Sequence, residues 1–239
     1  MGANDNVATR MKIYRFLRDG KIEQAPAEEM VGDAELLPPV NPGKIVCIGR
    51  NYADHAKELG NEPPSEPIIF LKPPSAVIGP EGMIVIPPQS QRVDFEGELA
   101  IVVGKTARNI RAAEWRDYVA GFTCANDVTA RDLQKKDVQF TRGKSFDTFL
   151  PLGPCLSTDV DPAASRLITR VNGEVRQDGN TREMIFGCDR IFEFISSVMT
   201  LNPGDVILTG TPAGVGPLKS GDTVEVEIEG IGTLRNVVI

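Results

Sequence analysis

Apolar and polar positions along this chain alternate or cluster in short segments, and they predict more strands than helices. Leu99-Ala-Ile-Val-Val103 is apolar throughout, which is typical of a strand buried on both faces. Residues 223–229 alternate Val and Ile with Thr and Glu, the pattern of a half-buried strand. Further strands are expected over residues 44–48, 68–71, 83–86, 120–125, 206–209 and 233–238.

Two turn dipeptides predict β-hairpins. Asp19-Gly20 separates the segments 12–17 and 22–24, and Asn172-Gly173 separates 167–171 and 174–177. A proline-rich stretch over residues 37–42 then divides the first hairpin from the strand that begins at residue 44. We therefore expect a disordered tail (1–10), a small N-terminal β region (11–43) and a larger main domain (44–239).

Helices are expected to be few. Apolar residues recur at helical spacing over residues 112–119, 130–135 and 189–199. A fourth, short helix is expected over residues 51–60, with Asn51 as its N-cap and Gly60 at its end. Because strands outnumber helices and no βαβ unit repeats, the fold is predicted to be α+β and predominantly β.

Composition excludes several classes of protein. The 239 residues include 33 acidic and 26 basic side chains, a net charge of −7 that argues against a nucleic-acid partner. No apolar stretch is long enough for a membrane span or a signal peptide. One histidine and four widely spaced cysteines argue against a Cys/His zinc site. We expect a cytoplasmic protein with reduced cysteines.

Three carboxylates are candidate metal ligands. Glu96 and Glu98 are two residues apart on a predicted strand, so they face the same side, and they lead into the buried run 99–103. Asp127 ends a second apolar segment. Oxygen donors without Cys or His suit Mg²⁺ or Mn²⁺, with Ca²⁺ also possible. The same Glu-x-Glu spacing also occurs on solvated strand faces, as we expect for residues 225–229.

Three other features could carry chemistry. His55 and Glu58 are neighbours on one helical face, where the carboxylate would orient the imidazole as a general base; an ordinary surface pair has the same spacing. That short helix lies between loops and could act as a lid. Lys144 lies in a Gly/Ser turn, where it could hold an anion or be solvated. Thr211 lies in a glycine-rich loop that lacks the features of a nucleotide site.

Six segments in this order resemble the fumarylacetoacetate hydrolase family, and most of all its short branch that acts on acylpyruvates and oxaloacetate: Ile48–His55, Phe70–Pro73, Asp94–Ala100, Asn126–Asp132, Gly143–Phe146 and Thr209–Gly216. The resemblance implies a mixed β catalytic domain, a short lid helix and a homodimer. It assigns roles to ten residues: metal ligands Glu96, Glu98 and Asp127; catalytic residues His55, Glu58 and Lys144; and substrate or site residues Arg131, Gln134, Thr211 and Lys72.

The resemblance further implies an Mg²⁺- or Mn²⁺-dependent hydrolase. Such an enzyme would cleave the C–C bond of a β-dicarbonyl 2-oxo acid, for example acetylpyruvate or fumarylpyruvate, giving pyruvate and a carboxylic acid. An oxaloacetate decarboxylase or tautomerase, or a decarboxylase or isomerase of aromatic catabolism, would use the same scaffold. A protein that binds a divalent ion without catalysis is the alternative from another class.

Overall fold

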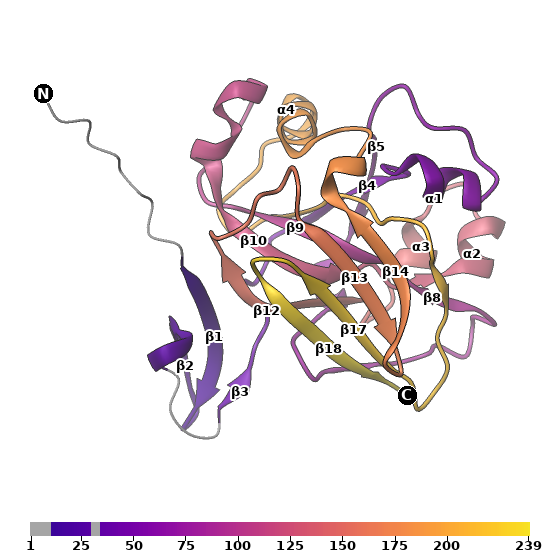
Figure 1. Cartoon of the computed structure of the whole chain (residues 1–239), viewed down its shortest axis with the longest axis horizontal. Coiled ribbons are helices and arrows are strands. Elements are labelled where there is room, and N and C mark those ends of the chain that lie inside the picture. Colours follow the sequence, from indigo (N-terminus) through magenta and orange to yellow (C-terminus); the bar gives the residue numbers. More distant parts are fainter. Residues whose placement is uncertain (1–10, 30–33) are drawn as a thin grey trace, which may run out of the picture.

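The structure is a computed structural model that describes residues 11–29 and 34–239. The tail expected to be disordered, residues 1–10, lies outside the described residues. Within them strands dominate and the helices are short, as the hydrophobic pattern predicts (Figure 1). The fold is therefore of the predominantly β, α+β class.

The largest sheet runs through most of the molecule. Its main strands, in order across the sheet, are β2 (Lys21–Pro26), β1 (Lys12–Arg18), β12 (Leu150–Ser157), β10 (Val119–Asn126), β9 (Gly97–Val103), β15 (Val206–Leu208), β4 (Ile45–Gly49) and β5 (Ile68–Lys72). The short strands β3 (Glu35–Leu36) and β6 (Val77–Ile78) pair with β1 and β12. Because β1 pairs with β12, the N-terminal hairpin extends this sheet, at the opposite end of the molecule from α1–α3 (Figure 1).

Two smaller sheets complete the fold. The five-stranded sheet has the order β14 (Glu174–Asn180), β13 (Arg166–Val171), β17 (Thr223–Ile228), β18 (Gly232–Val238) and β7 (Met83–Ile84). The three-stranded sheet has the order β11 (Thr129–Ala130), β8 (Val93–Phe95) and β16 (Gly216–Pro217). Both predicted hairpins form, and both residues of each turn have positive φ. The strand predicted over 83–86 is shorter, ending at residue 84.

The helices are α1 (Ala53–Glu58), α2 (Arg131–Lys136), α3 (Thr141–Lys144) and α4 (Cys188–Val198), with 3₁₀ turns η1 (Ala27–Glu29), η2 (Pro74–Ala76), η3 (Ala112–Tyr118) and η4 (Thr181–Glu183). The helix predicted over 112–119 is thus a 3₁₀ segment, in which Trp115 packs against Phe122 and Phe192. The prediction that Asn51 caps α1 is wrong. Tyr52 holds the N-cap position, and the Asn51 amide instead bonds the backbones of Phe186 and Thr209.

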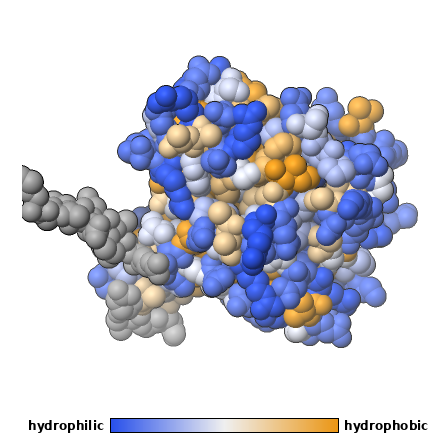
Figure 2. All heavy atoms as spheres, turned by 45° about the horizontal axis from the view of Figure 1, so that its top comes forward, coloured by the Kyte–Doolittle hydropathy of each residue, from blue (hydrophilic) through white to orange (hydrophobic). Residues whose placement is uncertain are grey.

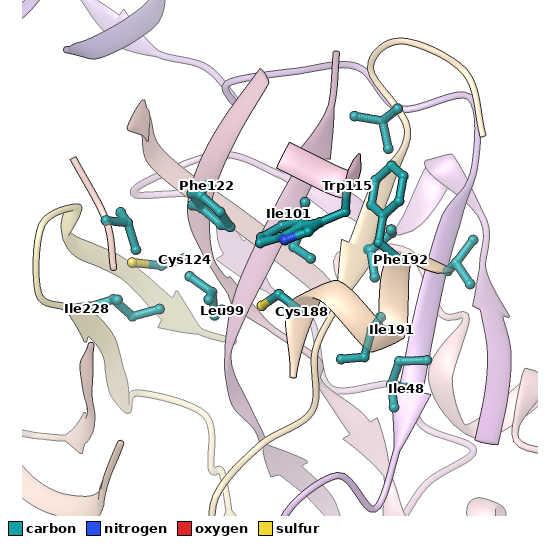
Figure 3. Packing of buried hydrophobic residues seen from close by; sticks show 14 of the residues in the cluster. Ile48, Leu99, Ile101, Trp115, Phe122, Cys124, Cys188, Ile191, Phe192 and Ile228 are labelled. Atoms are coloured by element: carbon teal, nitrogen blue, oxygen red, sulfur yellow. The ribbon is translucent and has the colours of Figure 1, made fainter. Parts of the chain in front are cut away.

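Strand β9 is buried on both faces, as predicted. Leu99 and Ile101 point into the cluster between the large sheet, α4 and the five-stranded sheet (Figure 3). Ala100 and Val102, on the other face, belong to a second cluster with residues of β4 and β12. Burying each large aliphatic side chain contributes about 1.5–3 kcal/mol to stability, so this strand is a rigid support for whatever its first residues carry.

The outer surface seen in Figure 2 is mostly hydrophilic, with apolar residues in small separate groups. Among the described residues no helix is long and apolar enough to cross a membrane. All four cysteines are buried and unpaired, as expected for small core residues.

Candidate active site

A cavity of about 340 Å³ opens beside α1, α2 and α3, the three short helices grouped on one side of the molecule (Figure 1). Its volume suits a small-molecule ligand. Eight of the ten residues assigned by sequence line it: His55, Glu96, Glu98, Asp127, Arg131, Gln134, Lys144 and Thr211. The other two are not among the lining residues: Glu58 contacts His55, and Lys72 contacts Asp127.

Strand register brings the three carboxylates together. Glu96 lies in the link between β8 and β9, Glu98 lies on β9, and Asp127 follows β10, the antiparallel neighbour of β9. The Asp127 N–H donates to the Glu96 carbonyl at 2.8 Å, and the Glu96 N–H donates to Asn126 Oδ1 at 2.9 Å. The three side chains each offer an oxygen within 4.8 Å of the others, and all are buried.

A glycine separates the two glutamates for a steric reason. A Cβ atom on Gly97 would lie 2.2 Å from Thr169 Oγ1 of β13 and 3.3 Å from Val226 Cγ1 of β17. The five-stranded sheet therefore presses against the backbone at Gly97. Since side chains alternate along a strand, Glu96 and Glu98 are directed away from that sheet and toward the cavity.

Two of the carboxylates already have buried cationic partners. Lys144 Nζ donates to Glu96 Oε2 and to Asp127 Oδ2, both at 2.7 Å, and Lys72 Nζ donates to Asp127 Oδ1 at 2.7 Å. Burial alone would raise the pKa of Glu96, but Lys144 and Arg131 hold it below its usual value. Burial would likewise lower the pKa of Lys144, yet Asp127 and Glu96 raise it, so the lysine stays protonated. Lys144 is thus not a solvated turn residue: it ends helix α3 and is buried.

Glu98 is different, because it forms no ion pair with any described residue. Its Oε2 accepts one hydrogen bond, from the Gly210 N–H at 2.6 Å. Burial raises its pKa well above the usual value, and the nearby carboxylates of Asp127 and Glu96 raise it further. Three buried hard oxygen donors, one of them without a counter-charge, fit a divalent cation. The trio could therefore hold such an ion.

The imidazole of His55 is oriented by a chain of two contacts. Its Nδ1 lies 3.1 Å from Glu58 Oε2, on the same face of α1 as predicted. The other oxygen of Glu58 accepts a hydrogen bond of 3.0 Å from the Gly214 N–H, in the glycine-rich loop. The glycine-rich loop thereby holds the Glu58 carboxylate in place, and this carboxylate orients the His55 ring. His55 itself is only 4% exposed.

Arg131 is held between three acceptors. Its guanidinium donates to Asp94 Oδ2 at 2.9 Å, to Glu96 Oε1 at 2.5 Å and to Gln134 Oε1 at 2.7 Å. Burial opposes its charge, but the ion pairs with Glu96 and Asp94 raise its pKa above the usual value. Asp94 is a site residue that the sequence reasoning missed, although it precedes Glu96 at the same i, i+2 spacing.

Gln177 of β14 is a second residue that was missed, and no local pattern marks it. Its Nε2 donates to Thr211 Oγ1 at 2.7 Å and to the Pro212 carbonyl at 2.8 Å, while its Oε1 accepts from the Gly97 N–H at 3.0 Å. Thr211 Oγ1 in turn donates to the Gly97 carbonyl at 2.7 Å. One buried amide therefore ties the glutamate-bearing strand to the glycine-rich loop.

Comparison with known proteins gives several relatives that cover most of the chain. An uncharacterised protein of Methanocaldococcus jannaschii is 56% identical over 211 residues, 88% of this chain and 89% of its own. Human mitochondrial oxaloacetate tautomerase FAHD2A is 49% identical over 216 residues, 85% of this chain and 69% of its own.

Solved structures share the fold over nearly the whole chain. A 2-hydroxyhepta-2,4-diene-1,7-dioate isomerase from Mycobacterium marinum has a TM-score of 0.88 and 43% identity, covering 96% of this chain and 98% of its own. Fumarylpyruvate hydrolase from Pseudomonas aeruginosa, solved with Mn²⁺ and pyruvate, has a TM-score of 0.80 and 31% identity, covering 88% and 94%. The family described as fumarylacetoacetate (FAA) hydrolase C-terminal matches residues 44–239. The chain belongs to the fumarylacetoacetate hydrolase family.

Proposed function

We propose that this protein is an Mg²⁺- or Mn²⁺-dependent hydrolase that cleaves the C–C bond of an acylpyruvate, giving pyruvate and a carboxylic acid. One observation carries the proposal. The cavity brings together the acidic trio, a protonated lysine and a histidine oriented by a carboxylate. The similar structure of fumarylpyruvate hydrolase, which was solved with Mn²⁺ and pyruvate, supports the proposal.

Glu96, Glu98 and Asp127 would hold the ion, which when bound would draw the electrons of the breaking bond toward the 2-oxo end of the substrate. Lys144 uses two of its three N–H groups on Glu96 and Asp127, which leaves one for the developing enolate oxygen. Arg131 uses three of its five N–H groups, and the amide nitrogen of Gln134 has no partner among the described residues. These donors would bind the substrate carboxylate.

His55 would act as the general base. Glu58 accepts a hydrogen bond from Nδ1–H, which leaves the lone pair on Nε2 to take a proton from water. The hydroxide oxygen then bonds to the distal carbonyl carbon, the C–C bond breaks, and the departing carbon keeps the electron pair as the enolate of pyruvate. That carbon finally receives the proton that His55 took from water, which restores the neutral imidazole. Thr211, held by Gln177, also lines the cavity and would contact the substrate.

Oxaloacetate tautomerisation is the second candidate, and the relative at 49% identity favours it. The same enolate stabilisation would serve, with a proton moved between carbon and oxygen and no attack by water. A decarboxylase would need the same groups. The two candidates differ in their dependence on a base that activates water.

Loss of the enol absorbance of acetylpyruvate tests the proposal. We expect turnover with Mg²⁺ or Mn²⁺, no turnover after EDTA, recovery on adding the ion, and one pyruvate formed per substrate consumed. His55→Ala should lower hydrolysis by about a hundredfold or more. Full hydrolase activity in that variant would refute the assigned base. A protein inert on every β-dicarbonyl acid, with or without the ion, would favour ion binding without catalysis.

A further inference from the structure

Asn51 is fully buried next to a cavity-lining residue, Arg50, but does not line the cavity itself. Its Nδ2 donates to the carbonyls of Thr209 at 2.8 Å and Phe186 at 3.0 Å, and its Oδ1 accepts from the Phe186 N–H at 2.8 Å. The Asn51 carbonyl accepts a further bond from the Ile185 N–H at 2.8 Å. One residue therefore joins the start of α1 to the glycine-rich loop and to the link between η4 and α4.

The peptide group between Thr209 and Gly210 connects Asn51 to the three carboxylates. Its carbonyl accepts from Asn51 Nδ2, and its N–H donates to Glu98 Oε2 at 2.6 Å. Two hydrogen bonds made through one peptide group polarise that group, so each bond strengthens the other. Among the described residues this peptide is the one hydrogen-bond donor to the Glu98 carboxylate. The position of that carboxylate thus depends on the peptide, and through it on Asn51.

Close packing keeps this peptide in place. Gly210 has φ of +98°, and a Cβ atom there would lie 2.7 Å from the Cβ of Asn51. Arg50, the residue before Asn51, has φ of +58°, a conformation that is unfavourable for a residue with a Cβ atom. Because the hydrogen bonds of Asn51 hold both segments in these conformations, the junction of β4 with α1 and the glycine-rich loop fit together in one arrangement.

Helix α1 depends on such anchors because it is short. Its six residues have no side-chain cap at the N-cap Tyr52, and a helix of this length is not stable by itself in water. Asn51 holds the chain just before the helix, and the bond from the Gly214 N–H to Glu58 holds its end. The His55 ring is therefore placed only as precisely as these contacts allow.

We propose that Asn51 is a positioning residue that couples the ion site to helix α1. When Glu98 holds an ion, its carboxylate is fixed, the Thr209–Gly210 peptide is fixed with it, and Asn51 transmits this order to the start of α1. The coupling is reciprocal, because a well-anchored α1 also holds Glu98 ready for the ion. This inference rests on the proposed function, since it links the ion to the general base His55.

Hydrogen exchange measured by mass spectrometry tests the coupling in the wild-type protein. The amides of Ala56 and Leu59 donate within and at the end of α1, so their exchange reports local opening of the helix. They should exchange about tenfold more slowly with saturating Mg²⁺ than with EDTA. Residues 79–82, which lie outside the cavity wall, should exchange equally in both conditions. Exchange in α1 that ignores the ion would overturn the proposal, whether or not any variant folds.

Asn236 supplies a matched control for Asn51. It is also buried, and its Nδ2 also donates to two backbone carbonyls, those of Gly79 and Gly82, both at 2.9 Å. Neither Asn236 nor these glycines line the cavity. Asn51→Ala should weaken Mn²⁺ binding about tenfold by electron paramagnetic resonance, and saturating Mg²⁺ should then change α1 exchange less than about twofold. Asn236→Ala should also lose stability but keep the wild-type values of both measurements.

The outcomes separate this inference from the proposed reaction. If Asn51→Ala binds Mn²⁺ as tightly as the wild type, or if Asn236→Ala loses the effect of the ion on α1 to the same extent, Asn51 is structural only and the coupling is refuted, even if acetylpyruvate is cleaved. If the ion orders α1 through Asn51 but no acylpyruvate is cleaved, the coupling stands and the hydrolase is refuted.

Discussion

The chain contains three Glu-x-Glu pairs, at 96/98, 225/227 and 227/229, and the copy at 96/98 has surroundings opposite to those of the copy at 225/227. Glu96-Gly97-Glu98 is buried and lines the cavity, with Glu96 4% and Glu98 2% exposed. Glu225-Val226-Glu227 lies on β17, where Val226 is buried and both glutamates reach solvent. The central residues meet, because the position of a Gly97 Cβ lies 3.3 Å from Val226 Cγ1. The two pairs of carboxylates therefore point in opposite directions from one contact.

What differs is the surroundings of each strand, not its pattern. Strand β9 has paired neighbours on both sides and apolar clusters on both faces, so its carboxylates need partners or a cation. Strand β17 covers the core with one face only, and its glutamates pair across the sheet surface with Arg170 or remain hydrated. Burial turns an ordinary acidic strand into a candidate ion site.

The largest difference between the two copies should come from removing one carboxylate in each. Glu98→Gln replaces a carboxylate by a neutral amide with a single, weaker oxygen donor. It should lower turnover by at least about a hundredfold, since even groups that only support a metal ligand cost ten- to a hundredfold. The same change should raise the melting temperature of the metal-free protein. A neutral amide avoids both the burial of a carboxylate without a cationic partner and the proton uptake that the raised pKa of Glu98 otherwise requires.

Glu227→Gln is the matched control. It should change turnover less than twofold and lower the melting temperature slightly, because it breaks only the half-exposed pair with Arg170. Steady-state assays and thermal denaturation with EDTA give both readouts. Similar losses of turnover in the two variants would show that burial does not distinguish the copies.

The next difference should come from the cationic partners. Lys144→Met removes a buried cation that contacts two carboxylates, and should cost about 3–5 kcal/mol in the free energy of unfolding. Arg170→Met breaks the half-exposed pair with Glu227 and should cost about 0.5 kcal/mol. Urea denaturation of the metal-free proteins measures both. Equal costs would mean that the lysine contributes as little as a surface residue.

The smallest effect should come from the amide of Gln177, which connects strand β9 to the glycine-rich loop. Gln177→Met leaves the Gly97 N–H and the Thr211 hydroxyl with unmet hydrogen bonds, and should cost about 1–2 kcal/mol. Because the glutamates shift with Gly97, the affinity for Mn²⁺ should also fall by about tenfold. Asp178→Asn, one residue along β14 in an exposed pair with Arg166, is the control and should leave Mn²⁺ affinity unchanged. Lost stability with unchanged Mn²⁺ affinity would make Gln177 structural only.

The sequence alone predicted those parts of the fold that depend on a local pattern of residues. The apolar run 99–103, the alternation over 223–229 and the two turn dipeptides predicted strands and hairpins that form. It failed where a polar side chain bonds across the fold. Asn51 bonds Phe186 instead of capping its helix, and Gln177 contacts Gly97 eighty residues away. Arg50 shows the same limit, because its positive φ is imposed by tertiary contacts.

The central claim is that three acidic side chains hold one divalent cation on which turnover depends. Electron paramagnetic resonance of Mn²⁺ titrated into the metal-free protein tests it most directly, with turnover of acetylpyruvate measured in the same samples. The account predicts one bound ion per chain and turnover that rises in proportion to its occupancy. Turnover at zero occupancy, or an ion that binds equally well to Glu98→Gln, would contradict it.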